Sequence, residues 1–245
     1  MTSGGNARMG DASLRAIRAA LRAEANKEDA VHLQRFFKTG PGEYAEGDRF
    51  LGVRVPATRR VARAHRSLSL DDTLSLLRSE WHEERLLALL LLVDAHARGT
   101  DVDRAAIYNA YLAHTRYIDN WDLVDSSAAQ IVGPHVLPNA IGPLEQLARS
   151  QHLWERRIAI IATSYWIRVG EFAPTMRIAE MLLHDSHDLI HKAVGWMLRE
   201  VGNRSRPVEE AFLRTHCRVM PRTMLRYAIE KFPERLRKTY LAGAV

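Results

Sequence analysis

The segment Trp154-Glu-Arg-Arg-Ile-Ala-Ile-Ile161 opens with a polar turn and continues as an apolar run. Ile158, Ala162 and Tyr165 follow one another at i, i+4 and i+7, so they share one face of a helix. A helix with such an apolar ridge buries it against neighbouring elements. The segment therefore predicts a core-facing helix within a larger packed structure.

Three other segments share this pattern of a polar start followed by an apolar ridge: Trp81-His-Glu-Glu-Arg-Leu-Leu-Ala88, Trp121-Asp-Leu-Val-Asp-Ser-Ser-Ala128 and His191-Lys-Ala-Val-Gly-Trp-Met-Leu198. The four starts lie about 33 to 40 residues apart, which is the spacing of stacked helix pairs. Two ridges are expected to be buried, namely Val124, Ala128 and Ile131, and Ile190, Val194, Met197 and Val201. We predict an all-α solenoid that forms one domain over residues 11–245.

Local signals agree with helices from Asp11 onward. Ser69, followed by two aspartates, predicts a helix start, and Gly99 predicts the end of a helix that runs from about Glu80 to His96. Prolines lie between or break the apolar segments: Pro134, Pro138, Pro143, Pro174, Pro207, Pro221 and Pro233. The main stretch with a β-type pattern is residues 50–55.

The sequence shows no pattern of a secretory signal or of a membrane-spanning helix. Residues 1–10 are rich in glycine and lack the apolar stretch of a secretory signal, so we expect a flexible N-terminus there. The longest apolar run, residues 86–93, is too short to cross a bilayer and predicts a buried helix. The single cysteine, Cys217, cannot form an internal disulfide, which fits a reducing cytoplasm. We expect no membrane partner.

The chain is basic, with 35 Lys and Arg against 29 Asp and Glu and a formal net charge of +6. This excess permits binding to an anionic polymer but does not establish it. Arginine outnumbers lysine strongly, which suits bidentate phosphate contacts and fits a GC-rich genome equally well.

Some polar and aromatic residues lie off the predicted apolar ridges. Trp121 and Asp125 are four residues apart on one helix face, and Lys192, Trp196 and Arg199 share another at i, i+4 and i+7. Arg157 lies beside the Ile158 ridge. Such residues could form a cradle for a sugar, a base and phosphates, but a helical tryptophan more often fills a core, and Asp125 could simply pair with an arginine. The spacing therefore predicts a candidate face and leaves the reaction open.

Motifs for other chemistries are absent from the sequence. There is no Gly-x-x-x-x-Gly-Lys phosphate loop, no Gly-x-Gly-x-x-Gly and no His-Glu-x-x-His. His184, His187 and His191 have partly helical spacing, which is a weak signal for a metal site. Lys192 is the only lysine near the candidate face, and phosphate contact suits it better than a Schiff base. We expect neither a metal nor a cofactor.

Five segments, in order and in register from about Val31 to Phe232, resemble the AlkD family of bacterial DNA alkylation-repair glycosylases, which are built from HEAT-like repeats. These segments are Phe50-Leu-Gly-Val-Arg-Val-Pro56, Asn120-Trp-Asp-Leu-Val-Asp125, Trp154-Glu-Arg-Arg157, Lys192-Ala-Val-Gly-Trp-Met-Leu-Arg-Glu200 and Met220-Pro-Arg-Thr-Met-Leu-Arg-Tyr-Ala-Ile-Glu230. The resemblance implies a superhelical HEAT-like solenoid with a concave, basic DNA-binding face. It also implies a monomer that removes N3- or N7-alkylated purines from double-stranded DNA and leaves an abasic site.

The resemblance also implies roles for single residues. Asp125 corresponds to the catalytic aspartate, Trp121 and Trp196 to the active-site tryptophans, and Arg157 to the active-site arginine. The residues implied to lie near DNA are Arg199, Lys192, Arg156, Phe36 and Lys38. Phe36 occupies the place of an N-terminal aromatic residue that closes over the lesion, although Tyr44 could take that place instead.

Three alternatives stay open at this point. The first is a related HEAT-like protein that binds branched or damaged DNA without catalysis. The second is a scaffold whose concave face holds a peptide. The third is a glycosylase specialised in self-resistance to a bulky natural-product adduct.

Overall fold

The computed structural model describes the backbone of residues 3–244 and, from Ser13 onward, the side chains as well. These residues form α-helices and short 3-10 helices without a β-strand, which confirms the all-α prediction. The chain divides into two compact units, Met1–Ser127 and Ala128–Val245. The single domain expected from the sequence stays a prediction.

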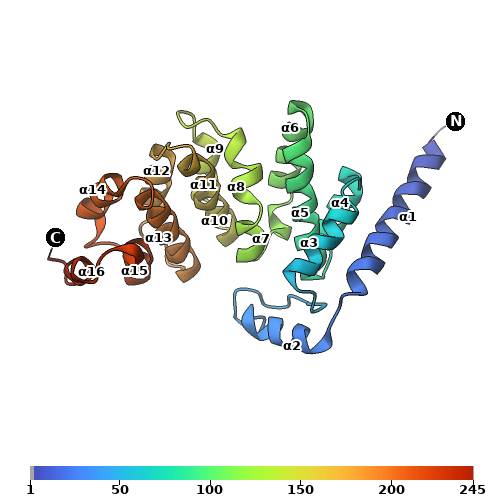
Figure 1. Ribbon diagram of the computed structural model, residues 1–245, viewed down its shortest axis with the longest axis horizontal. Helices are drawn as coiled ribbons and strands as arrows, with labels where there is room; N and C mark the ends of the chain where they lie inside the picture. The colour runs from blue at the N-terminus through green and yellow to red at the C-terminus, as the bar shows by residue number, and fades with distance from the viewer. Residues whose placement is uncertain (1–2, 245) are drawn as a thin grey trace. The chain divides into compact units, whose positions relative to one another are not determined.

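Unit 1 contains seven α-helices and one 3-10 helix: α1 (Ser3–Arg22), α2 (Lys27–Phe36), α3 (Val55–Ala64), α4 (Leu70–Leu77), α5 (His82–Arg98), α6 (Asp101–Ala113), η1 (Thr115–Tyr117) and α7 (Trp121–Asp125). Helices α3, α4 and α6 each pack on α5, and α1 packs on α3 and α4 (Figure 1). The predicted caps are confirmed, because the Ser69 side chain accepts from the amide of Asp72 and Gly99 ends α5.

The connection between α2 and α3 is a long loop that the first turn of α5 holds in place. The buried Glu83 carboxylate accepts hydrogen bonds from three successive amides, those of Leu51, Gly52 and Val53, at 2.8 to 3.1 Å. Gly52 adopts a φ of +81°, and a Cβ there would lie 1.9 Å from the Asn26 carbonyl oxygen. The loop is therefore specified by one carboxylate and one glycine. The residues 50–55, which have a β-type pattern, form the end of this loop and the first residue of α3 instead of a strand.

Unit 2 contains nine α-helices and two 3-10 helices: α8 (Ala128–Ile131), η2 (Gly133–His135), α9 (Gly142–Ala148), α10 (Leu153–Ala162), α11 (Ser164–Arg168), α12 (Ala173–Met181), α13 (Asp188–Gly202), α14 (Arg206–His216), α15 (Arg222–Ala228), η3 (Ile229–Lys231) and α16 (Glu234–Leu241). Most of its prolines act as predicted: Pro143, Pro174 and Pro207 lie in the first turn of a helix, where no amide donor is needed, and Pro221 and Pro233 immediately precede one.

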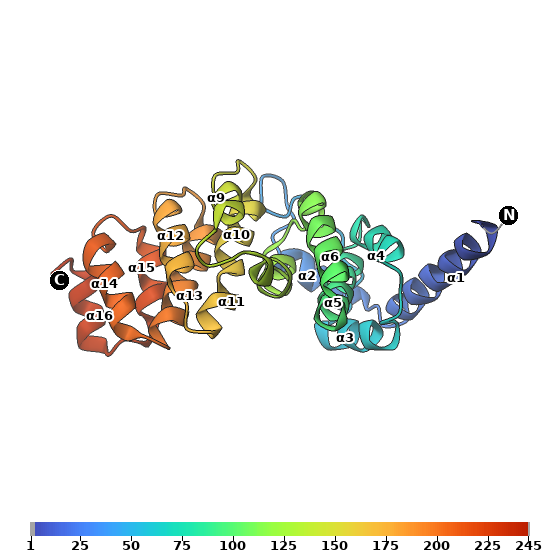
Figure 2. The same ribbon diagram turned by 90° about the horizontal axis from the view of Figure 1, so that it is seen from above.

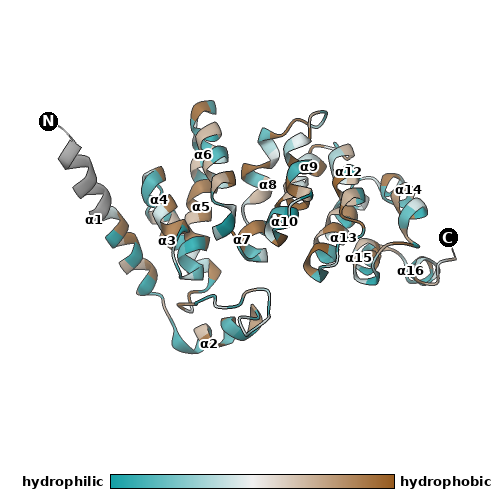
Figure 3. Ribbon diagram, turned by 180° about the vertical axis from the view of Figure 1, so that it is seen from behind, coloured by the Kyte–Doolittle hydropathy of each residue, from teal (hydrophilic) through white to brown (hydrophobic). Residues whose placement is uncertain are grey.

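Helix α13 is the centre of unit 2. It packs on α10, α12, α14 and α15, so helices that are close in sequence are close in space, as in an α-solenoid (Figure 2). The predicted ridge Ile190, Val194, Met197 and Val201 is buried, and the colouring in Figure 3 shows α13 with hydrophobic and hydrophilic sides. Tyr165 is the exception among the predicted ridge residues, because it is only half-buried.

The N-terminal residues are mostly helical. Met1 and Thr2 of the N-terminus expected to be flexible lie outside the described residues, whereas Ser3–Gly10 belong to α1, which begins earlier than the apolar spacing predicts. Adding residues to an existing helix costs little once its first turn has formed. Among the described residues, no helix is both long and apolar enough to span a membrane.

Gly195 allows α15 to approach α13 closely. A Cβ at this position would lie 2.4 Å from the Met224 carbonyl oxygen and 2.5 Å from Cβ of Tyr227. We expect Gly195→Ala to lower the free energy of unfolding by about 1–3 kcal/mol, because overpacking displaces backbone here. Gly142→Ala is the matched control, since a Cβ there meets nothing within 4 Å. Urea unfolding of both variants measures the difference, and equal stabilities would contradict the close packing.

Candidate functional site

Helix α7 carries two of the predicted site residues, Trp121 and Asp125. The buried Asn120 caps the helix by accepting from the Trp121 amide at 2.9 Å. Leu123 and Val124 point into the core, whereas Trp121 and Asp125 are half-buried on the other side of the helix. The helix therefore anchors itself through its apolar face and presents an indole and a carboxylate.

A series of aromatic rings supports Trp121. The Phe37 ring stacks on Trp121 with ring centroids 5.3 Å apart. It also contacts the rings of Phe50 and His82, at centroid distances of 5.1 Å and 4.9 Å. Phe36, the last residue of α2, lies with its ring edge-on to Trp121 at 6.0 Å and is 56% exposed. The structure thus places Phe36, the first choice for the N-terminal aromatic residue, directly beside Trp121.

A buried polar network lies beneath α7. The imidazole of His82, 2% exposed, lies between two carboxylates: Nδ1 is 2.8 Å from Asp48 Oδ2 and Nε2 is 2.9 Å from Asp122 Oδ2. Burial alone lowers the pKa of His82, but the charges and hydrogen bonds of Asp122 and Asp48 outweigh it and raise the pKa to about 9. The pKa of Asp48 is lowered despite its burial, because His82 and Arg85 both bind it.

Arg85 completes this network. Its Nη2 lies 2.8 Å from Asp48 Oδ1 and 3.1 Å from Asp119 Oδ1, and Nη1 donates to the Ser79 carbonyl at 3.1 Å. Burial acts to lower the pKa of Arg85, but the two aspartates raise it overall. Because Asp119 and Asp122 flank the cap of α7, the network ties the start of that helix to α5.

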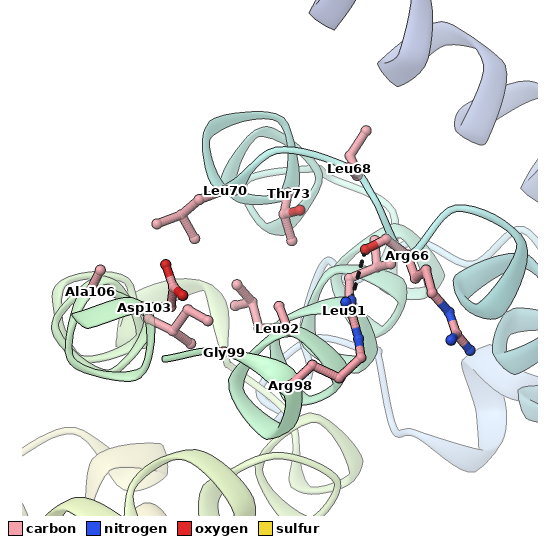
Figure 4. A pocket seen from close by; sticks show the side chains of 12 residues that line it. Arg66, Leu68, Leu70, Thr73, Leu91, Leu92, Arg98, Gly99, Asp103 and Ala106 are labelled. Carbon is pink, nitrogen blue, oxygen red and sulfur yellow. Dashed lines mark hydrogen bonds between the residues drawn. The ribbon is translucent and has the colours of Figure 1, made fainter. Parts of the chain in front are cut away.

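Two pockets lie within unit 1. One, of about 310 Å³, borders the aromatic series and is lined by Phe36, Phe37, Phe50 and residues of the loop after it. The other, of about 330 Å³, lies between α4, α5 and α6 and is lined by apolar side chains together with Arg66, Arg98 and Asp103. Arg98 donates to the Arg66 carbonyl at 3.0 Å (Figure 4). None of the site residues predicted from the sequence lines the second pocket.

In unit 2, α13 carries Trp196 with Lys192 and Arg199 one turn to either side. Trp196 is half-buried, and its indole N–H donates to Glu200 Oε1 at 3.3 Å. Lys192 Nζ lies 2.7 Å from Asp188 Oδ2, and Arg199 pairs with Glu230. Both cations are therefore partly neutralised by neighbouring acids.

The two arginines of α10 are more buried than a phosphate contact requires. Arg157 is 5% exposed and donates through Nη1 to the Leu189 carbonyl at 2.6 Å, which joins α10 to the first turn of α13. Arg156 binds Asp185 through Nε at 2.6 Å and two carbonyls of the preceding loop through Nη1. Both side chains thus have structural partners, and their contacts with DNA remain predictions from the resemblance.

The structure brings the predicted residues together in two sets. Trp121, Asp125 and Phe36 belong to unit 1, and so does Lys38, which is exposed with a φ of +55° just after α2. The second set, in unit 2, comprises Arg156, Arg157, Lys192, Trp196 and Arg199. Within residues 13–244, no three His, Cys, Asp or Glu side chains are grouped so that they could hold a metal ion.

Comparison with known proteins identifies the family of this chain. The family model described as DNA alkylation repair enzyme matches residues 17–232. The chain belongs to the DNA alkylation repair enzyme family. The structure of a predicted DNA alkylation repair enzyme from Enterococcus faecalis superposes with a TM-score of 0.65 at 15% identity, over 86% of this chain and 98% of that one. No curated protein sequence matches the chain significantly.

Membership of the DNA alkylation repair enzyme family indicates a role in the repair of alkylated DNA and implies DNA binding. It confirms the resemblance on which the sequence prediction rested. The sequence patterns did not indicate His82, Asp48 or Asp122, although His82 directly follows Trp81 at the start of one of the four repeated segments. The only signal was a run of four ionisable residues, 82–85, at the start of a helix otherwise rich in leucine.

Phe36 and Phe37 are neighbours with opposite environments. Phe37 is 6% exposed and contacts four rings, so Phe37→Ala is expected to cost about 3–5 kcal/mol of unfolding free energy. Phe36→Ala is expected to change stability by less than about 0.5 kcal/mol, because its ring is exposed. Chemical denaturation of the two variants tests this, and a similar loss in both would show that Phe36 belongs to the core.

Proposed function

We propose that this protein is a monofunctional DNA glycosylase that hydrolyses the N-glycosidic bond of cationic N3- or N7-alkylated purines in double-stranded DNA and leaves an abasic site. The observation that carries the proposal is the pairing of Asp125 with Trp121 on α7, half-buried on one face, in a chain of the DNA alkylation repair enzyme family. No cofactor is required for this reaction.

The proposed reaction requires a carboxylate near the sugar and does not require a general acid that protonates the base. An N3- or N7-alkylated purine carries a positive charge, so it leaves without protonation by the enzyme. Positive charge then develops at C1′ of the deoxyribose as the bond lengthens. A carboxylate near that carbon stabilises this charge and orients or deprotonates the attacking water. We assign these roles to Asp125.

Trp121 can also stabilise the positive charge that develops on the deoxyribose. The face of an indole attracts a cation, an interaction worth roughly 0.5–2 kcal/mol. Its ring is held by Phe37 from beneath and by Phe36 at its edge, so it has little freedom to turn away. Phe36, exposed beside it, can contact the nucleotide that carries the lesion. Trp196 and Arg157 have corresponding roles by resemblance.

Selectivity follows from the lesion's own charge. A neutral adduct is a poor leaving group without an acid to protonate it, and the carboxylate of Asp125 does not supply one. The proposed enzyme therefore favours cationic lesions. A protein of the same family that binds damaged DNA without catalysis is the second candidate, and the two are separated by whether abasic sites form.

The central residue is tested with Asp125→Asn, which keeps the shape of the side chain and removes its charge. We expect single-turnover release of N7-methylguanine from a defined duplex to fall by about 100-fold or more, because the developing cation loses its counter-charge. The affinity for the same duplex is expected to be unchanged.

Asp101→Asn is the control for this test, because Asp101 has a fully exposed side chain and also lies in unit 1. Its rate of release should equal that of the wild type. An Asp125→Asn variant that releases the base at the wild-type rate would refute the assigned role. A folded wild type that binds the duplex but forms no abasic site would favour the non-catalytic candidate.

Phosphate contact by Lys192 is tested through the salt dependence of DNA binding. We expect Lys192→Ala to reduce the slope of log K against log salt by about 0.9, the contribution of one neutralised phosphate. Lys238→Ala is a matched control, because Lys238 forms the same kind of i, i+4 pair with Glu234 at 2.8 Å. Equal slopes for the wild type and Lys192→Ala would remove Lys192 from the DNA-binding surface.

A further inference from the structure

His82 stands out among the buried groups that the proposed reaction does not use. It opens α5, and each of its ring nitrogens faces a carboxylate on a different segment: Asp48 in the loop after α2 and Asp122 in α7. An ionised carboxylate offers only acceptors, so both ring nitrogens can bond to such groups only if each carries a proton. The geometry therefore requires His82 to be an imidazolium cation.

The charges around His82 support that state. The carboxylates of Asp48 and Asp122 face the ring directly. Arg85, which binds Asp48, and Asp119, which pairs with Arg85, complete the cluster. With a neutral His82, three negative charges would meet a single buried positive charge. Glu83, the next residue, turns toward the loop amides and does not take part. The protonated ring reduces the net charge of the cluster from −2 to −1.

The cluster is connected to the residues proposed to act on DNA. Asp122 directly follows Trp121 and lies three residues before Asp125 in the short helix α7. On the other side, the His82 ring contacts Phe37, which stacks on Trp121. A movement of His82 is therefore transmitted to Trp121 by two routes, through the backbone of α7 and through the Phe37 ring.

We propose that His82 is a positioning residue that fixes helix α7, and with it Trp121 and Asp125, by bridging Asp48 and Asp122. It does not touch the substrate. The bridge holds only while the ring is charged, which makes the position of α7 dependent on pH. For its effect on base release, this inference rests on the proposed function.

The pH range follows from the raised pKa. A histidine whose pKa rises from 6.5 in the unfolded chain to about 9 in the folded protein contributes stability that is complete below pH 6.5 and is lost as the pH rises through about 9. The difference in melting temperature between the wild type and His82→Gln should therefore be largest near pH 6 and shrink toward pH 9.5. A difference that does not change over this range would overturn the charged bridge.

The positioning role is tested by ¹⁵N NMR of the indole N–H groups together with single-turnover kinetics. The Trp121 resonance, assigned with Trp121→Phe, should titrate with a midpoint near pH 9 in the wild type and stay fixed in His82→Gln. At pH 7, His82→Gln should release N7-methylguanine about 10- to 100-fold more slowly with unchanged DNA affinity, because a small misplacement of reacting groups has a large effect on rate.

Glu84→Gln is the matched control. Glu84 is also buried on the first turn of α5, but it binds Arg18 and Arg22 of α1 at 3.0 Å and makes no contact with α7 in this network. The Glu84→Gln variant should be less stable than the wild type, but the pH titration of the Trp121 resonance and the rate of base release should be unchanged. Equal losses of rate in Glu84→Gln and His82→Gln would reduce His82 to a structural residue and overturn the proposal.

Two results separate this inference from the proposed function. Titration of Trp121 without base release by the wild type would support the bridge and reject the glycosylase. Base release by the wild type, with Trp121 unresponsive to pH and to His82→Gln, would reject the bridge and keep the glycosylase. If His82→Gln does not fold, Asp122→Ala removes the acceptor of the same bond from the other side and is read in the same way.

Discussion

The buried polar turn His82-Glu83-Glu84-Arg85 is the constraint on which unit 1 depends. Each of its four residues is at most 4% exposed, and together they bind three parts of the unit. His82 and Arg85 hold the start of α7, Glu83 holds the loop before α3, and Glu84 holds α1. Four ionisable side chains are costly to bury unless every one has a partner. Here each has one, so the turn specifies how these segments are arranged around α5.

This arrangement explains how α7, a helix of five residues, can hold Trp121 and Asp125 in fixed positions. Helix α7 is too short to be stable alone. Its apolar side is anchored by Leu123 and Val124, its N-terminus by Asn120, and its first turn by the hydrogen bond that Asp122 accepts from His82. Trp121 and Asp125 are thereby held on the remaining face. A carboxylate stabilises a developing cation best when it is held in place before the reaction begins.

The sequence predicted the helical ridges because burial of apolar residues at helical spacing dominates the fold. Ile190, Val194 and Met197 are buried as expected, and Ser69 and Gly99 bound their helices. The position of Trp121 and Asp125 off the ridge also followed from spacing. The bridge by His82 could not be predicted, because Asp48 and Asp122 lie 34 and 40 residues away in sequence and no local pattern connects them. Arg157, which lies beside the Ile158 ridge, is buried, and this burial could not be predicted because spacing alone does not show which neighbour covers such a residue.

The central claim, that the lesion's own charge drives its removal, is tested most directly by offering the wild type two duplexes that differ in one base. One contains cationic N7-methylguanine and the other neutral 1,N6-ethenoadenine, and free base is measured by chromatography under single-turnover conditions. The account predicts release of N7-methylguanine with little or no release of the neutral base. Efficient release of 1,N6-ethenoadenine would contradict it, because that bond does not break readily without protonation of the leaving group.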